Sequence, residues 1–263
     1  MKLVYFLIFI FLFAFSANAQ IVINEVMYDP ISSDSYNEWI EIYNNGNGNV
    51  NLSGWSLCDK KILKGYINTS GYLFRNETFI LKSSSYAVIT DGRISTTGGT
   101  DAYKNFDVDN DSVALHVDVN SLCGGLGNTQ GIIILKDENN IVKDSVSYYN
   151  YWNSNNEGKS IELVNPSLNN NLSLSWNASL NFNGTPGSKN SNFLKIIFGD
   201  VSGNGFVSAY DASLILRYGA GKMSLSRIQF LSGDVNLNGI VNNEDSSLIL
   251  KYVVKKIKEL PIL

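Results

Sequence analysis

Short apolar runs and turn residues alternate along the chain from residue 20 to about residue 190. Clusters of Gly, Asn and Ser separate the runs, and almost no segment follows the helical period. This pattern is typical of a β-sandwich with about nine short strands. The predicted strands are Ile21–Met27, Glu38–Asn44, Trp55–Cys58, Phe79–Lys82, Tyr86–Thr90, Ser112–Val117, Gly131–Lys136, Ile141–Ser147 and Ser160–Val164.

From about residue 198 the pattern changes to apolar segments that each follow a repeated loop. The loops are Asp200–Asp211 and Asp234–Asp245, and Leu214–Tyr218 and Leu248–Tyr252 come directly after them. Each loop places oxygen-bearing side chains at positions 1, 3, 5, 9 and 12 and a glycine at position 6, as calcium loops do. A single copy could be an Asn-Gly turn, but a duplicated copy with matching helices favours calcium.

The predicted ligands would hold two Ca²⁺ ions, one in each loop. Position 7 contributes its backbone carbonyl and the other positions contribute side chains. The ligand residues are Asp200, Ser202, Asn204, Phe206, Ser208 and Asp211 in the first loop, and Asp234, Asn236, Asn238, Ile240, Asn242 and Asp245 in the second. Because each loop has only two carboxylates, we expect the affinity of extracellular calcium sites. A module of about 65 residues buries only a small core and needs additional stabilisation, so we expect its folding to depend on the ion.

Residues 198–263 resemble a type I dockerin, because Gly-Asp-Val, Asn-Gly, Asp and Ser-Leu-Ile-Leu recur in register and a helix tyrosine follows at the same offset. The resemblance implies a small all-α module with two EF-hand-like calcium loops that plugs a secreted protein into a cohesin. Dockerin loops usually carry Asn or Asp at position 3 and often Asp at position 5, whereas the first loop has Ser202 and Asn204. Weaker calcium binding is the expected consequence.

The resemblance also implies which residues contact the cohesin. They stand at loop positions 10 and 11 and on the following helices, and the alternative is that they are merely exposed. The residues are Ala209, Tyr210, Leu216, Arg217, Asn243, Glu244, Leu250 and Lys251. Positions 10 and 11 differ between the two copies, so binding in two equivalent orientations is not expected.

The amino-terminal residues have the layout of a secretory signal peptide. Met1-Lys2 precedes the apolar run Leu3–Phe15, and Ala17-Asn18-Ala19 forms an Ala-x-Ala cleavage site. The run is shorter than the roughly 20 residues of a membrane span, although an uncleaved anchor is the alternative. We therefore expect a secreted, extracellular protein that starts at Gln20 and is not embedded in a membrane. A cohesin is the expected means of holding it at the cell surface.

Secretion changes the interpretation of the two cysteines. In an oxidising compartment Cys58 and Cys123 are expected to form a disulfide, or to be two buried thiols. A catalytic thiol is disfavoured because His116 is the only histidine. The formal net charge is −4, and no basic stripe indicates a nucleic-acid partner.

The strand-rich part resembles a lamin tail domain, an immunoglobulin-like sandwich. The resemblance is carried by six segments, which are Ile23–Tyr28, Glu38–Asn44, Leu52–Leu57, Asp144–Tyr148, Ser160–Leu163 and Gly184–Gly187. It implies a binding or architectural role, and a sandwich alone does not fix an activity. The expected organisation is a signal peptide at 1–19, the sandwich at 20–190, a linker at 191–197 and the dockerin at 198–263. Ser188–Asn192 is polar, and we expect it to be flexible enough for the domains to reorient.

Three features of the sandwich suggest other chemistry. Glu38 and Glu41 could be a glycosidase pair, but residues three apart in a strand point to opposite faces, which favours a structural strand. Asp107, Asp109 and Asp111 are either a third calcium site or an acidic turn. An aromatic cluster could stack on sugar rings or simply pack in the core. The cluster consists of Tyr148, Tyr149, Tyr151 and Trp152.

Together these patterns predict a secreted, non-catalytic protein whose dockerin docks the sandwich onto a cohesin-bearing scaffold or cell surface. A carbohydrate or cell-envelope ligand of the sandwich would make it an accessory of a polysaccharide-degrading, cellulosome-like complex. Two alternatives are a hydrolase that acts on glycans within such a complex and a structural component of the cell surface.

Overall fold

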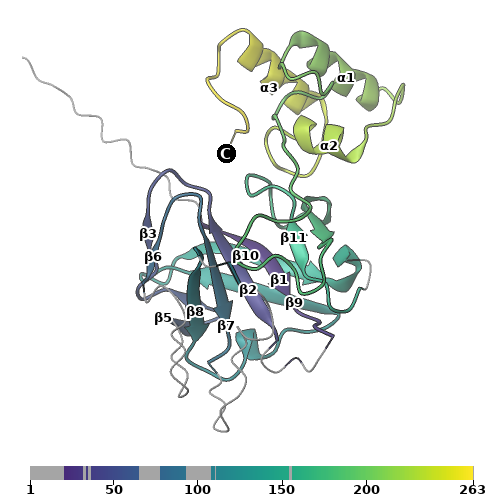
Figure 1. Ribbon diagram of the computed structural model, residues 1–263. Coiled ribbons are helices and arrows are strands. Elements are labelled where there is room, and N and C mark those ends of the chain that lie inside the picture. Colours follow the sequence, from purple (N-terminus) through teal and green to yellow (C-terminus); the bar gives the residue numbers. More distant parts are fainter. Residues whose placement is uncertain are drawn as a thin grey trace, which may run out of the picture.

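The computed structural model describes residues 21–31, 34, 37–64, 78–92, 108–109, 111–153 and 156–262. The signal peptide predicted at 1–19 lies outside these residues. The chain forms a strand-rich part, which ends shortly after residue 178, and a smaller helical part at its carboxyl end (Figure 1). The predicted all-β sandwich followed by a small all-α module is confirmed.

Among the described residues, ten strands form one continuous sheet and two short strands form a second sheet. The order in the large sheet is β10-β9-β4-β5-β8-β7-β2-β1-β11-β12, and β7 and β8 are its parallel pair. The strands are β1 Ile21–Met27, β2 Trp39–Asn44, β3 Val50–Asn51, β4 Ser56–Leu57, β5 Lys60–Lys64, β6 Ile80–Leu81, β7 Tyr86–Thr90, β8 Val113–Val117, β9 Gln130–Lys136, β10 Val142–Tyr149, β11 Ile161–Leu163 and β12 Trp176–Ala178. Strand β10 also contacts β1, so the large sheet folds back on itself.

Strands β10 and β1 are connected by a side-chain hydrogen bond, and residues from several strands share one apolar core. Asp144 of β10 accepts a hydrogen bond of 2.6 Å from the backbone N–H of Ile23 in β1. Ile40, Leu57 and Ile133, from three different strands, are fully buried in the same apolar cluster. Burial of this cluster is the main favourable contribution to the stability of the sandwich.

All nine predicted strands correspond to observed strands, but three observed strands were not predicted. Val50–Asn51 has two residues, and Trp176–Ala178 has three, so neither is long enough to show alternation. Lys60–Lys64 contains three lysines, so the buried Ile62 and the half-buried Leu63 did not form a recognisable apolar strand pattern.

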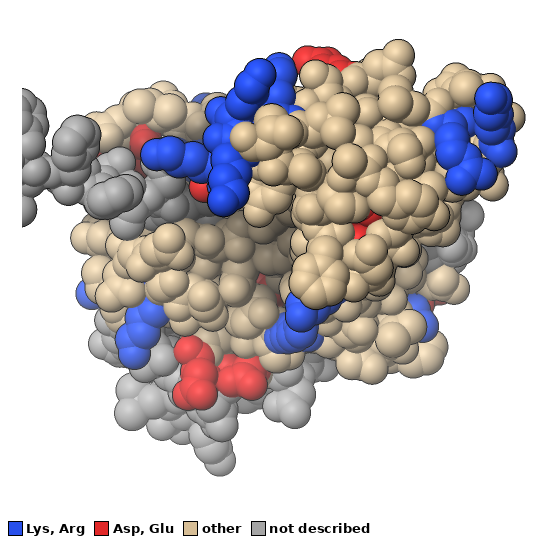
Figure 2. Space-filling view, turned by 90° about the horizontal axis from the view of Figure 1, so that it is seen from above, with Lys and Arg blue, Asp and Glu red and all other residues tan. Residues whose placement is uncertain are grey.

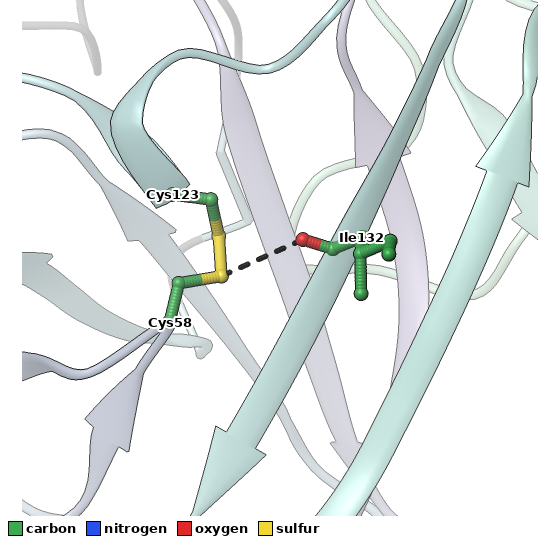
Figure 3. The surroundings of a disulfide bond; sticks show 3 residues. All are labelled: Cys58, Cys123 and Ile132. Atoms are coloured by element: carbon green, nitrogen blue, oxygen red, sulfur yellow. Dashed lines mark hydrogen bonds between the residues drawn. A yellow bond between two sulfur atoms is a disulfide. The ribbon is translucent and has the colours of Figure 1, made fainter.

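A disulfide joins Cys58, directly after β4, to Cys123, in the loop between β8 and β9 (Figure 3). The Sγ atom of Cys58 lies 3.7 Å from the carbonyl oxygen of Ile132. Since a disulfide sulfur carries no hydrogen, this approach is a packing contact. The bond closes a loop of 65 residues.

The helical part contains α1 Ala209–Gly219, α2 Arg227–Gly233 and α3 Asn243–Val253. Helices α1 and α3 pack on each other, and Ile215 and Ile249 are fully buried between them. Only α1 and α3 were predicted. The sequence signal for α2 was the capping box of Ser226 and Gln229, which the structure forms.

The segment between the two parts differs from the flexible polar linker that the sequence suggested. Asn190 is buried and donates hydrogen bonds to the carbonyl oxygens of Asn24 and Leu163. Farther along, the N–H of Leu194 donates to the carbonyl oxygen of Val164. These buried amides need partners within the sandwich, so the segment packs along it as part of the fold. Within the described residues, no helix has the length and apolar character needed to span a membrane.

Candidate calcium loops and docking face

The first loop is closed around its own carboxylates. Asp200, at position 1, accepts hydrogen bonds from the N–H groups of Asn204 and Gly205 at 3.1 and 2.7 Å. Asp211, at position 12, accepts from the N–H groups of Ser202 and Ser208 at 2.8 and 2.9 Å. Both carboxylates come from buried residues, although the loop itself is largely exposed. The backbone is therefore folded so that the loop oxygens converge.

The second loop repeats this geometry. Asp234 accepts from the N–H groups of Asn238 and Gly239 at 3.1 and 2.8 Å. Asp245 accepts from the N–H groups of Val235 and Asn242, both at 3.0 Å. Gly239 has a φ of +83°, and Gly205 in the first loop has a φ of +90°. Only glycine adopts this conformation without strain, which explains the residue at position 6.

Helix starts are built into both loops. Ser208 and Asn242, at position 9, are the N-cap residues of α1 and α3, and Asp211 and Asp245 complete their capping boxes. The same carboxylate thus serves as the predicted twelfth ligand and as the third residue of a helix. Ordering of the loop and the start of the helix are therefore one event.

The environments of the carboxylates differ between the loops. Burial raises the pKa of Asp245, and burial also raises the pKa of Asp234, where hydrogen bonds from the loop amides lower it and the Asp245 charge raises it further. Burial acts in the same direction on Asp211, but hydrogen bonds from Ser202 and Ser208 outweigh it and lower its pKa. In the second loop burial thus disfavours the charged form of both carboxylates, whereas in the first loop hydrogen bonds favour the charged form of Asp211.

The donor set fits a calcium ion. Carboxylate, amide, hydroxyl and carbonyl oxygens are the ligands of Ca²⁺, and these loops offer those oxygens only. Among the described residues, no group of three His, Cys, Asp or Glu side chains forms a metal site, which agrees with two carboxylates per loop. Phe206 and Ile240, at position 7, are 75% and 60% exposed. Their outward side chains are compatible with a carbonyl as the ligand.

All eight residues that the resemblance assigned to the partner are exposed. They lie on α1 and α3, which form the far side of the helical part, whereas α2 lies toward the sandwich (Figure 1). We call Ala209, Tyr210, Leu216, Arg217, Asn243, Glu244, Leu250 and Lys251 the docking face. Seen from above, basic side chains stand in separate groups on a mostly neutral surface (Figure 2). Tyr210, Leu216 and Leu250 are 57%, 46% and 40% exposed, so this surface carries apolar side chains.

The two described aspartates of the acidic segment, Asp109 and Asp111, are joined by local hydrogen bonds before β8. Asp109 accepts from the N–H of Asp111 at 2.9 Å, and its carbonyl accepts from the hydroxyl of Ser112. Asp107 lies outside the described residues. The aspartate pair that is described therefore supports the acidic-turn interpretation.

The sequence analysis did not predict that three glutamates meet in the interior of the sandwich. Glu25 of β1 pairs with Glu41 of β2 and with Glu162 of β11 in the strand register. All three side chains are fully buried, and we call them the glutamate cluster. Burial, and then the Glu162 charge, raises the pKa of Glu25 from 4.5 to about 8. Burial, and then the Glu25 charge, raises the pKa of Glu41 well above its ordinary value.

The segment 184–192 covers the glutamate cluster. Glu25 accepts from the hydroxyl of Ser160 at 2.5 Å and from the N–H of Thr185 at 2.8 Å. Glu41 accepts from the N–H of Gly187, and Glu162 accepts from Ser191 and Asn192. A polymer substrate cannot reach carboxylates that are covered in this way, so Glu41 is not placed to hydrolyse one.

The aromatic cluster is divided between core and surface. Tyr148 and Trp152 are buried, whereas Tyr149 and Tyr151 are 38% and 60% exposed. The rings of Tyr149 and Tyr151 stack with centroids 5.4 Å apart. Trp152 stacks on Trp176 of β12 inside the sandwich. The packing interpretation holds for the buried pair, and the two tyrosines form a small exposed aromatic surface.

Comparisons with known proteins match both parts. The dockerin type I family matches residues 198–254. Two structures of the third ScaC cohesin with the ScaB dockerin of Acetivibrio cellulolyticus share 40% identity, covering 26% of this chain and 94% of the matched chain, with a TM-score of 0.25. A type I cohesin–dockerin complex from Clostridium thermocellum shares 28% identity, covering 26% and 99%, with a TM-score of 0.24.

No curated protein matches the chain. The lamin tail domain family matches residues 14–150, which is more than half of the 263 residues. Eight of the nine predicted strands fall within residues 14–150, both loops fall within residues 198–254, and the strand predicted at Ser160–Val164 lies between the two matched ranges. The chain therefore belongs to the lamin tail domain family and carries a type I dockerin domain after it.

Proposed function

We propose that this chain is a secreted, non-catalytic protein whose dockerin, loaded with two Ca²⁺ ions, holds its lamin tail domain on a cohesin-bearing scaffold or cell surface. The observation that carries the proposal is the combination of two closed calcium loops with an exposed apolar face on the helices that those loops start. Type I dockerin domains bind calcium, and neither domain that the comparisons found is catalytic.

The docking step follows from the geometry of α1 and α3. An ion in each loop fixes the first turn of each helix, because Asp211 and Asp245 belong to both loop and helix. The two fixed helices, which pack on each other, then each present an exposed leucine, Leu216 on α1 and Leu250 on α3, together with exposed polar residues. An apolar centre with a polar rim is typical of a specific protein interface. Cohesin is the partner that a dockerin domain implies.

Binding of the mature chain to a panel of purified type I cohesin domains would test the proposal by surface plasmon resonance. Binding is expected in calcium, and chelation should abolish it. Leu216→Asp and Leu250→Asp should each weaken binding at least tenfold, because hot-spot residues contribute more than about 1.4 kcal/mol. Ile132→Asp is the matched control, since Ile132 is 63% exposed on β9. Equal binding by all variants, or binding without calcium, would contradict the proposal.

Secretion is supported by the layout of the first 19 residues and by the disulfide, which persists in oxidising compartments. The protein should be recovered from culture medium with Gln20 as its first residue, as amino-terminal sequencing would show. A protein that begins at Met1 and stays in the membrane fraction would instead indicate an uncleaved anchor.

A role as an accessory of a polysaccharide-degrading complex is a second part of the proposal. The stacked, exposed rings of Tyr149 and Tyr151 support it, because aromatic faces bind the apolar faces of sugar rings. Affinity electrophoresis in soluble polysaccharide gels should retard the mature chain, and the variant with both tyrosines changed to Ala should run freely. If retention in washed cell envelopes is seen without polysaccharide binding, a structural surface component is favoured. Release of reducing sugar would favour a hydrolase.

A further inference from the structure

The two calcium loops have different surroundings although their own geometries match. Gly203 and Gly205, at positions 4 and 6 of the first loop, have no neighbouring atom where a Cβ would stand. At position 6 of the second loop, a Cβ on Gly239 would lie 2.8 Å from Leu172. Leu172 belongs to the strand-rich part of the chain, between β11 and β12. The sandwich therefore contacts the second loop at position 6 and leaves positions 4 and 6 of the first loop open.

A hydrogen bond adds to this contact at position 4. The side-chain amide of Asn169 donates to the carbonyl oxygen of Leu237 at 2.9 Å. Leu237 has a φ of +56°, in the left-handed region that costs free energy for a residue other than glycine. The first loop has Gly203 at this position, with a φ of +72° and no such cost. The second loop thus contains a strained residue, and Asn169 of the strand-rich part donates a hydrogen bond to its carbonyl oxygen.

The same part of the sandwich also holds α2, the helix that leads into the second loop. Arg227 donates to the carbonyl oxygens of Leu174 at 2.7 and 3.0 Å and of Trp176 at 2.9 Å. Leu231 is buried with Val164 and Leu168 in an apolar cluster shared by the two domains. These contacts place the second loop against the sandwich in a defined orientation.

We propose that residues 164–175, the support loop, pre-organise the second calcium loop, so that the strand-rich part of the chain raises calcium affinity at that loop and not at the first. The inference rests on the proposed calcium binding. A contact that stabilises the ordered loop removes part of the ordering cost of metal binding. Because coupling is reciprocal, calcium in the second loop also tightens the contact between the domains. The docking face lies on the far side and stays free.

Nuclear magnetic resonance of the whole mature chain can read both loops in one titration. The N–H groups of Gly205 and Gly239 donate to Asp200 and Asp234, so their ¹H–¹⁵N signals report the two loops separately. In Leu172→Ala the calcium midpoint of Gly239 should rise about fivefold, the effect of losing one interaction of ordinary strength. The midpoint of Gly205 should stay within about twofold.

Asn169→Ala tests the hydrogen bond to Leu237 and should also raise the calcium midpoint of the Gly239 signal. Ile132→Ala is the control, because it shortens an exposed side chain of similar size on β9. It should change the calcium midpoint of neither glycine signal. An equal change in the calcium midpoints of both glycine signals, or an unchanged Gly239 midpoint in both variants, would overturn the inference while leaving calcium binding intact. If neither glycine of the unsubstituted chain responds to calcium, the calcium sites themselves fail, and the coupling fails with them.

Discussion

The glutamate cluster makes a prediction that separates a buried charge from an ordinary buried side chain. In Glu25→Gln the side chain keeps its shape, and its oxygen can accept from Ser160 and the N–H of Thr185 as Glu25 Oε1 does. Glu25 Oε2 lies 2.8 Å from the hydroxyl of Thr185, which also lies 3.2 Å from Glu162 Oε1. A hydroxyl donates only one proton. A proton on Glu25, or the amide of Gln, therefore lets position 25 donate to Thr185 while Thr185 donates to Glu162.

The magnitude follows from the pKa of Glu25, which burial raises from 4.5 to about 8. Between these values the folded protein keeps a proton that the unfolded chain loses, so stability falls as the pH rises. The contribution is present in full below pH 4.5, and it is lost once the pH passes about 8. A pKa difference of about 3.5, at about 1.4 kcal/mol for each pH unit, corresponds to on the order of 5 kcal/mol. Glu25→Gln lacks this loss.

Denaturant unfolding followed by tryptophan fluorescence measures the effect, because all four tryptophans lie in the strand-rich part of the chain. The variant and the unsubstituted chain should have similar unfolding free energies near pH 4.5. By pH 8.5 the variant should be more stable by several kcal/mol. Glu138→Gln, in the exposed turn after β9, is the control and should change little at either pH. A difference between the chains that does not grow with pH would refute the reasoning.

Three further outcomes are expected. Changing Cys58 and Cys123 to Ser should lower the unfolding free energy by roughly 4 kcal/mol, the chain-entropy value for a loop of 65 residues, and a reductant should then have no added effect. Gly184→Ala should cost more than Gly124→Ala in thermal unfolding, because both have positive φ but only at Gly184 would a Cβ meet Glu25, Ser160 and Trp39. Equal costs would exclude crowding of the cluster as the cause. Calcium chelation should lower helical circular dichroism while tryptophan fluorescence stays constant, and a joint change would contradict ion-dependent folding limited to the dockerin.

Most of the helices and strands could be predicted from local sequence patterns. A strand such as Ile21–Met27 or Tyr86–Thr90 is recognised from its own residues, because strand propensity and flanking turns act over a few positions. The candidate calcium loops are the extreme case, since their predicted side-chain ligands and their glycine lie within 12 consecutive residues. Where the element was too short, as in Val50–Asn51, or rich in lysine, as in Lys60–Lys64, local patterns were insufficient.

The sequence by itself therefore determined the two-part organisation, most of the strands and both loops with their helices. Only the tertiary structure decided the glutamate cluster, because Glu25, Glu41 and Glu162 meet through strand register across β2, β1 and β11, and their positions in the sequence carry no mark of it. The same holds for the contacts of Asn169 with Leu237 and of Leu172 with Gly239. Hydrogen bonding and packing between distant segments depend on how the whole chain folds, and no local pattern encodes which segments will meet.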